Sequence, residues 1–408
     1  MRYQPLSEAR AGPIWRRPEA FLVLTAIAMP LSFSVWSALL NNFVIEAASF
    51  DGADIGWLHT VREIPGLLAV GVIAIIVFIR EQVLALSMLI VLGAATAVTA
   101  FFPTMGGILA VTMISSIGFH YYETANQSLQ LQWLDRKRAP QVLGWLLAAG
   151  SAATLVAYAL IVLTWEAFDL DYSTVYMAAG GLTVLIAIYC FFAFPQIEAP
   201  VPQLKKIVLR RRYWLYYALE FMAGARRQIF VVFAGFMMVE KFGFQVHEVT
   251  ALYLINLVIN MVVAPMLGRA VQVFGERNTL SFEYVGLTLV FLAYGGLYYF
   301  SWGVAVAAFL YVVDHIFFGL ALAKKTYFQK IADDADIAPT AAVSFTINHI
   351  AAVFLPAALG YLWLAAPQAV FLLAAGMALI SLTLSLLIPR HPGPGNETIL
   401  TARALPAE

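Results

Sequence analysis

Residues 118–132 read GFHYYETANQSLQLQ, and this polar stretch lies inside a long apolar segment. Polar side chains recur on it and just before it, at Ser116, His120, Glu123, Gln127 and Gln130. Intervals of three and four residues place these groups on one face of a helix. Lipid does not tolerate such groups at membrane depth, so this face must contact protein or a water-filled cavity. The stretch therefore predicts one wall of a solute pathway.

The composition of the whole chain indicates an integral membrane protein. Of its 408 residues, 62% are hydrophobic and 12% are charged, whereas soluble proteins are about 45–50% apolar and about 25% charged. The 24 basic and 24 acidic residues leave no net charge and give no indication of nucleic-acid binding. The single cysteine, Cys190, excludes an intramolecular disulfide and a thiolate metal cluster.

Apolar segments of about 20 residues are long enough to cross a bilayer, and the chain contains twelve of them. The first six cover residues 20–45, 55–79, 83–102, 106–134, 141–164 and 175–194. The second six cover residues 213–239, 249–271, 280–300, 302–331, 340–365 and 368–388. The spans predict an N-terminal half, a cytoplasmic linker, a C-terminal half and a cytoplasmic tail at residues 1–194, 195–212, 213–388 and 389–408.

Basic residues predict the orientation of these spans. Lys and Arg concentrate in the N-terminal segment, the linker, the tail and alternate connections, whereas Lys241 is the single basic residue of the opposite connections. Because basic connections stay in the cytoplasm, both termini and the linker are expected there. The first span is too long for a signal peptide and lacks a cleavage site, so it predicts an uncleaved helix. The chain is thus predicted to be a multi-pass protein of the plasma (inner) membrane.

A weak internal repeat relates the two predicted halves. At an offset of 199 residues, matching residues are Gln130, Asp135, Ala139 and Pro140 with Gln329, Asp334, Ala338 and Pro339. Each half has an even number of helices, as in transporters built from two parallel six-helix repeats. In topology, repeat and linker, the chain resembles the major facilitator superfamily over essentially its whole length. The resemblance implies an all-α integral membrane fold of twelve transmembrane helices in two six-helix pseudo-repeats.

The sequence departs from two signatures of this family. The family's loop after the second helix of a half reads approximately G-x-x-x-D-R-x-G-R-R. Its glycines and arginines have counterparts in the second half at Gly268, Arg269, Gly275 and Arg277, but Gln272 replaces the acid. The fifth helix also lacks the Gly-Pro pair of the drug antiporters that the chain resembles. These departures disfavour the family's usual ionic latch and a drug-efflux function.

The resemblance implies that the first, fourth, seventh and tenth helices line a central cavity, and polar residues concentrate on these helices. At about 1.5 Å per residue, six of these side chains fall near the midplane, where substrate and coupling-ion sites of secondary transporters lie: His120, Glu123, Arg226, Arg227, Asp314 and His315. Glu283 lies nearer the expected end of its helix and is not included.

Arg227 and Arg226 are the predicted anion-binding residues, because a guanidinium matches the oxygens of a carboxylate or phosphate in a bidentate way. Arg227 is favoured because it shares one helical stripe with Glu220 and Gly224. The remaining predicted substrate-binding residues are Gln127, Asn41 and Tyr122.

Glu123, Asp314 and His120 are the predicted proton-coupling residues. Burial favours the protonated carboxyl and a nearby guanidinium favours the carboxylate, so a change of access could switch the proton. Imidazole titrates near neutrality. The structural alternative is that the two acids permanently neutralise Arg226 and Arg227, and that His120 is a packing residue.

Glu220, Lys324 and Lys325 are expected at similar depth in the cytoplasmic part of the membrane. They predict a salt bridge between the seventh and tenth helices that acts as an inner gate. Arg62 and Glu63 are neighbours in the second helix and are expected to pair with other helices.

Together these features predict a secondary active transporter, with no enzyme activity, that moves a small organic, anionic solute by alternating access in a proton-coupled symport or antiport. No cofactor and no nucleotide-binding loop is predicted. The expected partners are the solute, protons and the lipid bilayer, not nucleic acid, and the protein is expected to act as a monomer. One alternative is a polyspecific exporter of lipophilic compounds. Another is an intramembrane metal-dependent enzyme or metal carrier that uses His120, Glu123, Asp314 and His315.

Overall fold

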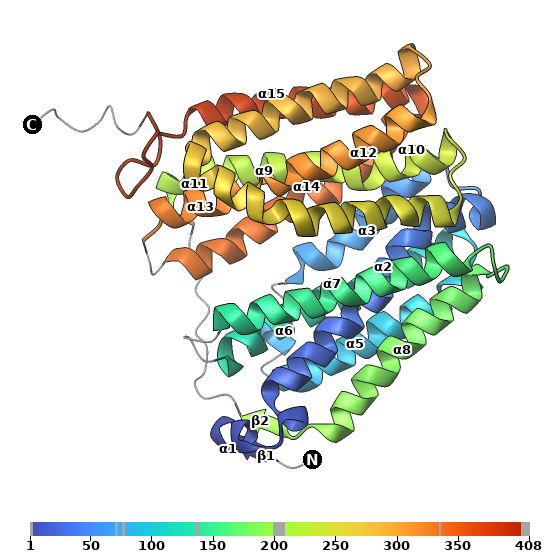
Figure 1. Cartoon of the computed structure of the whole chain (residues 1–408), viewed down its shortest axis with the longest axis vertical. Helices are drawn as coiled ribbons and strands as arrows, with labels where there is room; N and C mark the ends of the chain where they lie inside the picture. The colour runs from blue at the N-terminus through green and yellow to red at the C-terminus, as the bar shows by residue number, and fades with distance from the viewer. Residues whose placement is uncertain are drawn as a thin grey trace, which may run out of the picture. The chain divides into compact units, whose positions relative to one another are not determined.

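The computed structural model describes residues 3–69, 72–75, 78–134, 139–198, 209–333 and 336–400. These residues are almost entirely helical (Figure 1). In this described part, ten helices are long and apolar enough to cross a membrane. The two remaining predicted crossings correspond to α3 (Gly52–Leu67) followed by α4 (Val72–Ile75), and to α6 (Met105–Trp133). The prediction of an all-α membrane protein is therefore confirmed.

The chain folds into two compact units. Unit 1 comprises Met1–Phe50, Val61–Leu204 and Phe244–Leu254, and unit 2 comprises Asp51–Thr60, Lys205–Gly243 and Ile255–Glu408. These units differ from the predicted halves in two short segments. The start of α3 belongs to unit 2, and the start of α11 (Val246–Tyr299) belongs to unit 1. Some of the predicted linker, tail and repeat lies outside the described residues, at 199–208, 401–408, Asp135 and Asp334.

The remaining spans of unit 1 are α2 (Pro18–Ala48), α5 (Glu81–Val98), α7 (Ala139–Thr164) and α8 (Tyr172–Ala193). Helix α5 packs against α6 and α8, and α2 packs against α7 and α8. Glycines allow α5 and α8 to approach closely, because a Cβ atom on Gly93 would lie 2.7 Å from the carbonyl oxygen of Gly180. Such small residues are typical of contacts between membrane helices, where packing replaces the hydrophobic effect.

Unit 1 also contains a small structure that the sequence did not predict. Strand β1 (Tyr3–Pro5) pairs in parallel with β2 (Gln196–Glu198), and α1 (Leu6–Ala11) and the short helix η1 (Ile14–Arg16) follow β1. The Gln82 side chain bonds the backbone on either side of Gln196, at Pro195 O and Ile197 N, both at 3.0 Å. Strands of three residues joined over such a sequence distance leave no periodicity that a sequence pattern could show.

Unit 2 begins with a span made of the short helix η4 (Arg211–Tyr213), α9 (Trp214–Gln228), the π-helical segment η5 (Ile229–Ala234) and α10 (Gly235–Glu240). Helix α11 continues through two predicted spans, 249–271 and 280–300, with a bend at Gly275. The φ angle of Gly275 is +75°, a conformation that favours glycine over any residue with a Cβ. The other elements are α12 (Val304–Gly319), α13 (Leu322–Ile331), α14 (Ile337–Ala365) and α15 (Pro367–Leu386).

The contact between α5 and α8 predicts opposite effects for two adjacent glycines. Gly180→Ala should lower the thermal unfolding temperature of the purified protein, because the added Cβ would meet the backbone of Gly93 and Ala97; overpacking of this kind costs about 1–3 kcal/mol. Gly181→Ala is the matched control, because no atom lies within 4 Å of its added Cβ, and it should leave the temperature unchanged or raise it. Equal effects of the two substitutions would contradict this packing.

Candidate functional site

The polar stripe of α6 changes from buried to exposed along the helix. Ser116 and His120 are buried, Glu123 is half-buried and Gln127 is exposed. The Ser116 hydroxyl donates a hydrogen bond to the backbone oxygen of Arg62 on α3. The first half of the stripe therefore packs on unit 1 itself, and its role as a wall of the pathway stays a prediction for Glu123 and Gln127.

A second polar face of α6 binds the start of α5. Ser128 Oγ and Gln132 Nε2 donate hydrogen bonds to the two carboxylate oxygens of Glu81, at 2.7 and 2.6 Å. Gln132 Nε2 also lies 3.0 Å from Ser128 Oγ. This network has a structural role, because the two donors and both Glu81 oxygens are paired with one another inside unit 1.

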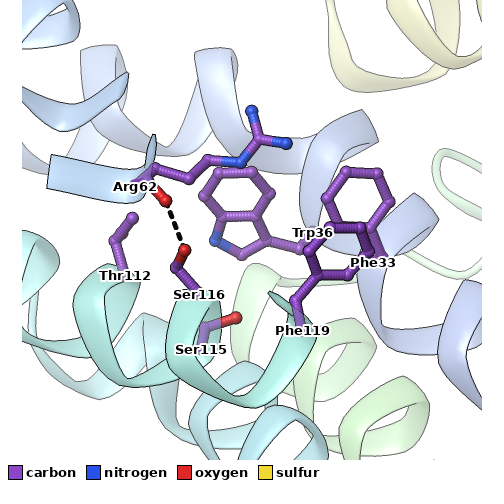
Figure 2. Close-up of a pocket in the computed structure, with 7 residues that line it drawn as sticks. All are labelled: Phe33, Trp36, Arg62, Thr112, Ser115, Ser116 and Phe119. Carbon is purple, nitrogen blue, oxygen red and sulfur yellow. Dashed lines mark hydrogen bonds between the residues drawn. The ribbon is translucent and has the colours of Figure 1, made fainter. Parts of the chain in front are cut away.

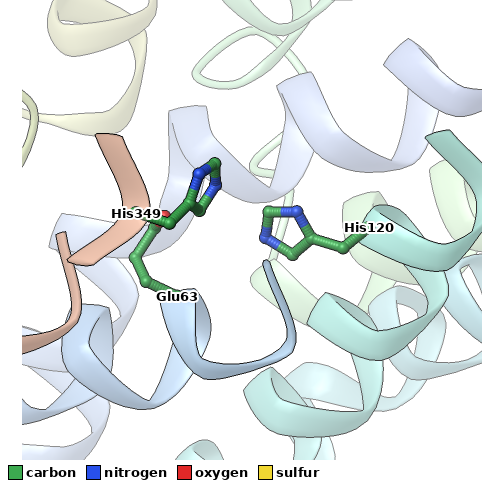
Figure 3. A group of neighbouring side chains, drawn as sticks. All are labelled: Glu63, His120 and His349. Atoms are coloured by element: carbon green, nitrogen blue, oxygen red, sulfur yellow. The ribbon is translucent and has the colours of Figure 1, made fainter. Parts of the chain in front are cut away.

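The fold of unit 1 brings Glu63 of α3 next to His120 of α6 (Figure 3). The two side chains are 3% and 4% exposed, and their possible ligand atoms lie within 4.8 Å of each other. Arg62 Nη1 lies 3.6 Å from Glu63 Oε1, a contact between sequence neighbours that the sequence analysis did not expect. A carboxylate beside an imidazole can hold a proton or supply two metal ligands. His349, also drawn in Figure 3, belongs to unit 2.

A small pocket lies between α2, α3 and α6 in unit 1 (Figure 2). Its lining comprises two aromatic residues of α2, the guanidinium of α3, and three hydroxyls and a phenyl ring of α6: Phe33, Trp36, Arg62, Thr112, Ser115, Ser116 and Phe119. The rings of Phe33 and Phe119 stack with centroids 4.6 Å apart. Of the described residues that line this pocket, only Ser116 belongs to the polar stripe of α6, and none is predicted to bind substrate or protons.

In unit 2, Arg226 is a fully buried cation with a fully buried partner. Its Nη2 lies 3.7 Å from Glu283 Oε1, both side chains are 0% exposed, and its guanidinium lies 4.5 Å from the ring centroid of Tyr284. Glu283 is not among the residues predicted from the sequence, because hydropathy places the start of a new span at residue 280. The second part of α11 begins at Gly275 instead, which places Glu283 two turns inside the helix.

Three further ionisable groups of unit 2, Glu220, Lys324 and Asp314, interact with this pair. Lys324 Nζ is 3.3 Å from Glu220 Oε1, so the predicted salt bridge between the seventh and tenth helices is present. Its function as a gate stays a prediction, and Lys325 is exposed. Asp314 is 0% exposed, and its carboxylate oxygens have no hydrogen-bond partner among the described residues.

The predicted substrate-binding residues fall into two groups. Arg227 and Gln127 are exposed, and Arg227 Nη2 donates a hydrogen bond to Asn348 Oδ1 at 3.0 Å. Asn41 is 4% exposed, and Tyr122 is 1% exposed within the hydrophobic core of unit 1. The environment of Tyr122 favours a packing role, and the substrate-binding roles of Arg227 and Gln127 stay predictions.

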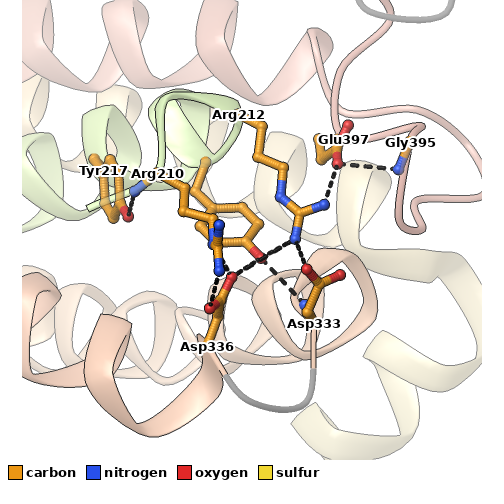
Figure 4. Close-up of polar contacts among 8 residues, drawn as sticks. Arg210, Arg212, Tyr217, Asp333, Asp336, Gly395 and Glu397 are labelled. Atoms are coloured by element: carbon orange, nitrogen blue, oxygen red, sulfur yellow. Dashed lines mark hydrogen bonds and ion pairs between the residues drawn. The ribbon is translucent and has the colours of Figure 1, made fainter. Parts of the chain in front are cut away.

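Charged residues form a clamp where the end of the linker meets the turn between α13 and α14 (Figure 4). Arg210 binds both carboxylate oxygens of Asp336, and Arg212 pairs with Asp333. The hydroxyl of Tyr213 donates to Asp336 Oδ2 at 3.0 Å. The C-terminal segment joins the clamp, because Arg212 Nη1 lies 3.9 Å from Glu397 Oε1 and Tyr327 Oη donates to Glu397 O at 2.6 Å.

The clamp predicts an acid-sensitive contribution to stability. The hydrogen bonds from Arg210 hold the pKa of Asp336 below its ordinary value, which is about 3.9. The contribution of this carboxylate should therefore be complete above about pH 4 and disappear as the pH falls below that value. The measurement compares the thermal unfolding temperatures of wild type and Asp336→Asn from pH 7 to pH 3. A difference that stays constant over this range would contradict the prediction.

Comparisons with solved structures agree with the observed architecture. A mutant of the nucleoside transporter NupG has a TM-score of 0.75 and 13% identity, covering 90% of this chain and 99% of that chain. A bacterial homolog of the human lysosomal transporter Spinster, in an inward-facing and occupied conformation, has a TM-score of 0.68 and 12% identity, covering 97% and 100%. A bacterial metal transporter has a TM-score of 0.66 and 10% identity, covering 90% and 97%.

At these identities the similarity to solved structures establishes the fold alone. A search of curated protein sequences finds no match. The family model described as Major Facilitator Superfamily matches residues 21–342, which is more than three quarters of the chain. The chain therefore belongs to the Major Facilitator Superfamily.

Proposed function

We propose that this protein is a secondary active transporter that moves a small organic anion by alternating access, coupled to protons. Its family and its structural neighbours make it a membrane transporter of a small-molecule solute rather than an enzyme, so the enzyme alternative is wrong. The location in the plasma membrane, the cytoplasmic position of both termini and the monomeric state belong to the proposal and rest on the sequence.

The charge balance of the buried group in unit 2 is the observation that supports proton coupling. Three acids, Glu220, Glu283 and Asp314, interact with two cations, Arg226 and Lys324. If all five were ionised, one negative charge would remain in excess. An uncompensated charge in a low-dielectric interior is costly, and a proton on one carboxylate removes it.

Asp314 is the proposed carrier of this proton. Glu220 has Lys324 at 3.3 Å and Glu283 has Arg226 at 3.7 Å. Asp314 forms no hydrogen bond with the described residues. Access of water to Asp314 would allow the proton to leave, and renewed burial would favour its return. The proposed inner gate, formed by Glu220 with Lys324 and the nearby Lys325, would control that access.

Glu123 and His120 are the proposed proton-coupling residues of unit 1. Glu123 is half-buried on the exposed side of the α6 stripe, and His120 lies beside Glu63. This pair of neighbours supports a proton-binding role for His120, because a carboxylate stabilises the imidazolium form.

Arg227 is the proposed anion-binding residue of unit 2. Arg226 is already neutralised by Glu283, whereas the hydrogen-bond partner of Arg227 is the uncharged amide of Asn348. The exposed Arg227 therefore keeps a positive charge that a carboxylate or phosphate can use. Gln127 is exposed as well and can add a hydrogen bond, while Asn41 and Tyr122 would contribute only if unit 1 opened around them.

Two alternatives make different predictions. An exporter of lipophilic compounds would use the charged groups only for structure, so its transport would not depend on Arg227. A metal carrier is favoured by the proximity of Glu63 and His120 in unit 1. Stoichiometric zinc, iron or manganese in the purified protein, lost in His120→Ala, would support that alternative against the proposal.

The proposal predicts that an organic acid added to proteoliposomes evokes a pH change that requires Asp314. Asp314→Asn should abolish the pH change while exchange of labelled solute for unlabelled solute continues, because exchange needs no net proton movement. Arg227→Gln should reduce both signals roughly tenfold or more, since a hydrogen bond to a charged group contributes about 1.5–3 kcal/mol. Lys330→Gln is the control, because its partner Glu276 lies outside the proposed site.

Three transport results would contradict parts of this proposal. A pH change that persists in both Asp314→Asn and Glu123→Gln would contradict the assignment of the proton carriers. Uptake of every anionic solute that is unaffected by Arg227→Gln would contradict the assignment of the anion-binding residue. If no organic acid evoked transport or a pH change in wild type, the proposed function itself would be wrong.

A further inference from the structure

The pocket between Phe33, Trp36 and Arg62 in unit 1 contains one buried donor, the Trp36 indole N–H, that has no acceptor among the described residues. Trp36 is 4% exposed, and its Nε1–H has no hydrogen-bond partner among the described residues. Figure 2 shows this nitrogen on the side of the indole that faces the hydroxyl-bearing residues of α6. A buried donor without an acceptor is destabilising by about 1–3 kcal/mol, so an acceptor that entered the pocket would gain a hydrogen bond there.

Among the described residues that line the pocket, the one charged side chain is the cation Arg62. The Arg62 guanidinium lies 5.2 Å from the ring centroid of Phe33 and 5.4 Å from that of Trp36, which fixes it over two aromatic faces. The hydroxyls of Thr112 and Ser115 add further groups that can donate hydrogen bonds. A guanidinium, an indole N–H and hydroxyls together match the oxygen atoms of an anion.

The size of the pocket limits which part of an anion can enter. The space inside the pocket has room for about one water-sized group. A carboxylate oxygen fits this space, whereas the body of an organic molecule does not. The tail of such a molecule would have to lie outside, against the stacked rings of Phe33 and Phe119.

We propose that the Trp36–Arg62 pocket is a subsite for the carboxylate group of an organic monocarboxylate whose apolar tail packs on the rings of Phe33 and Phe119. This inference rests on the proposed function, because it takes the solute to be an organic anion. It adds Trp36 and Arg62, which are not among the predicted substrate-binding residues. An arriving carboxylate would compete with Glu63, whose Oε1 lies 3.6 Å from Arg62 Nη1. Binding would thus release Glu63 towards His120, its other close neighbour.

The test measures binding to the purified full-length protein by the shift of its thermal unfolding temperature. The probes are sodium benzoate and sodium hexanoate, with benzamide as the uncharged match and sodium chloride at equal ionic strength. Both carboxylates should stabilise the wild type, because a ligand that binds only the native state raises its stability. Benzamide and chloride should not.

Substitutions at two pocket positions, Trp36 and Arg62, test whether the carboxylates bind in this pocket. Trp36→Phe keeps an aromatic ring but removes the N–H donor together with part of the ring volume, and it should raise the dissociation constant for benzoate roughly tenfold. Arg62→Gln should abolish the shift, and Arg62→Lys should restore part of it because the charge returns without the bidentate geometry. Trp145→Phe is the matched control, since Trp145 is an exposed tryptophan of α7, and it should bind like wild type.

Each other outcome overturns the inference. If neither carboxylate shifts the wild type, the pocket holds only water. If Trp36→Phe and Arg62→Gln bind benzoate as tightly as Trp145→Phe, carboxylates bind elsewhere. In that second case, proton-coupled transport of an organic acid in proteoliposomes would still support the proposed function, so the two failures are distinguishable.

Discussion

A guanidinium enclosed by apolar helices must be neutralised, and in unit 2 the carboxylate of Glu283 meets that requirement for Arg226. The pair is fully buried, with 3.7 Å between Nη2 and Oε1. A buried ion pair adds little net stability, but the loss of one partner is strongly destabilising because the other charge remains. This constraint assigns Arg226 to the structure of the unit. It leaves Arg227, one residue further along α9, as the exposed cation of that helix.

The same constraint gives Asp314 its distinct role in the account. Lys324 serves Glu220 and Arg226 serves Glu283, so the acid without a cation of its own is the group that a proton neutralises best. In unit 1 the cation that needs neutralisation is Arg62. It contacts Glu63 and two aromatic rings at the edge of a pocket rich in donors. Each unit therefore combines a carboxylate near a guanidinium with a second cation or donor to which we assign the solute in the proposals above.

Hydropathy and length were sufficient to predict the membrane fold, because apolar runs of about 20 residues have few other solutions. The bend at Gly275 was visible as a family signature, but its position could not fix where the next helix begins, so Glu283 was placed too near an end. The salt bridge between Glu220 and Lys324 was predicted from depth alone. The pocket at Trp36 was missed because it joins three helices, and a helical stripe reports only one face of one helix.

The direction of each side chain explains the other differences between the residues grouped by spacing and their positions in the structure. Spacing along α6 correctly grouped His120 with Glu123, yet only the fold shows that one is enclosed beside Glu63 and the other is half-buried. Tyr122 lies on the opposite side of the same helix, in the core. The clamp at Asp336 and the strand pair at the start of the chain depend on contacts between distant segments, which a single sequence does not encode as a periodic pattern.

Thermal unfolding of Glu283 variants tests most directly whether the Arg226–Glu283 pair determines which charges are structural. Glu283→Gln should destabilise the protein by about 3–5 kcal/mol, because Arg226 remains buried without its counter-charge. The double variant Arg226→Met with Glu283→Leu should regain most of the lost stability, since it removes both charges and keeps apolar volume. Additive losses in the double variant, or a Glu283→Gln protein as stable as wild type, would contradict the account.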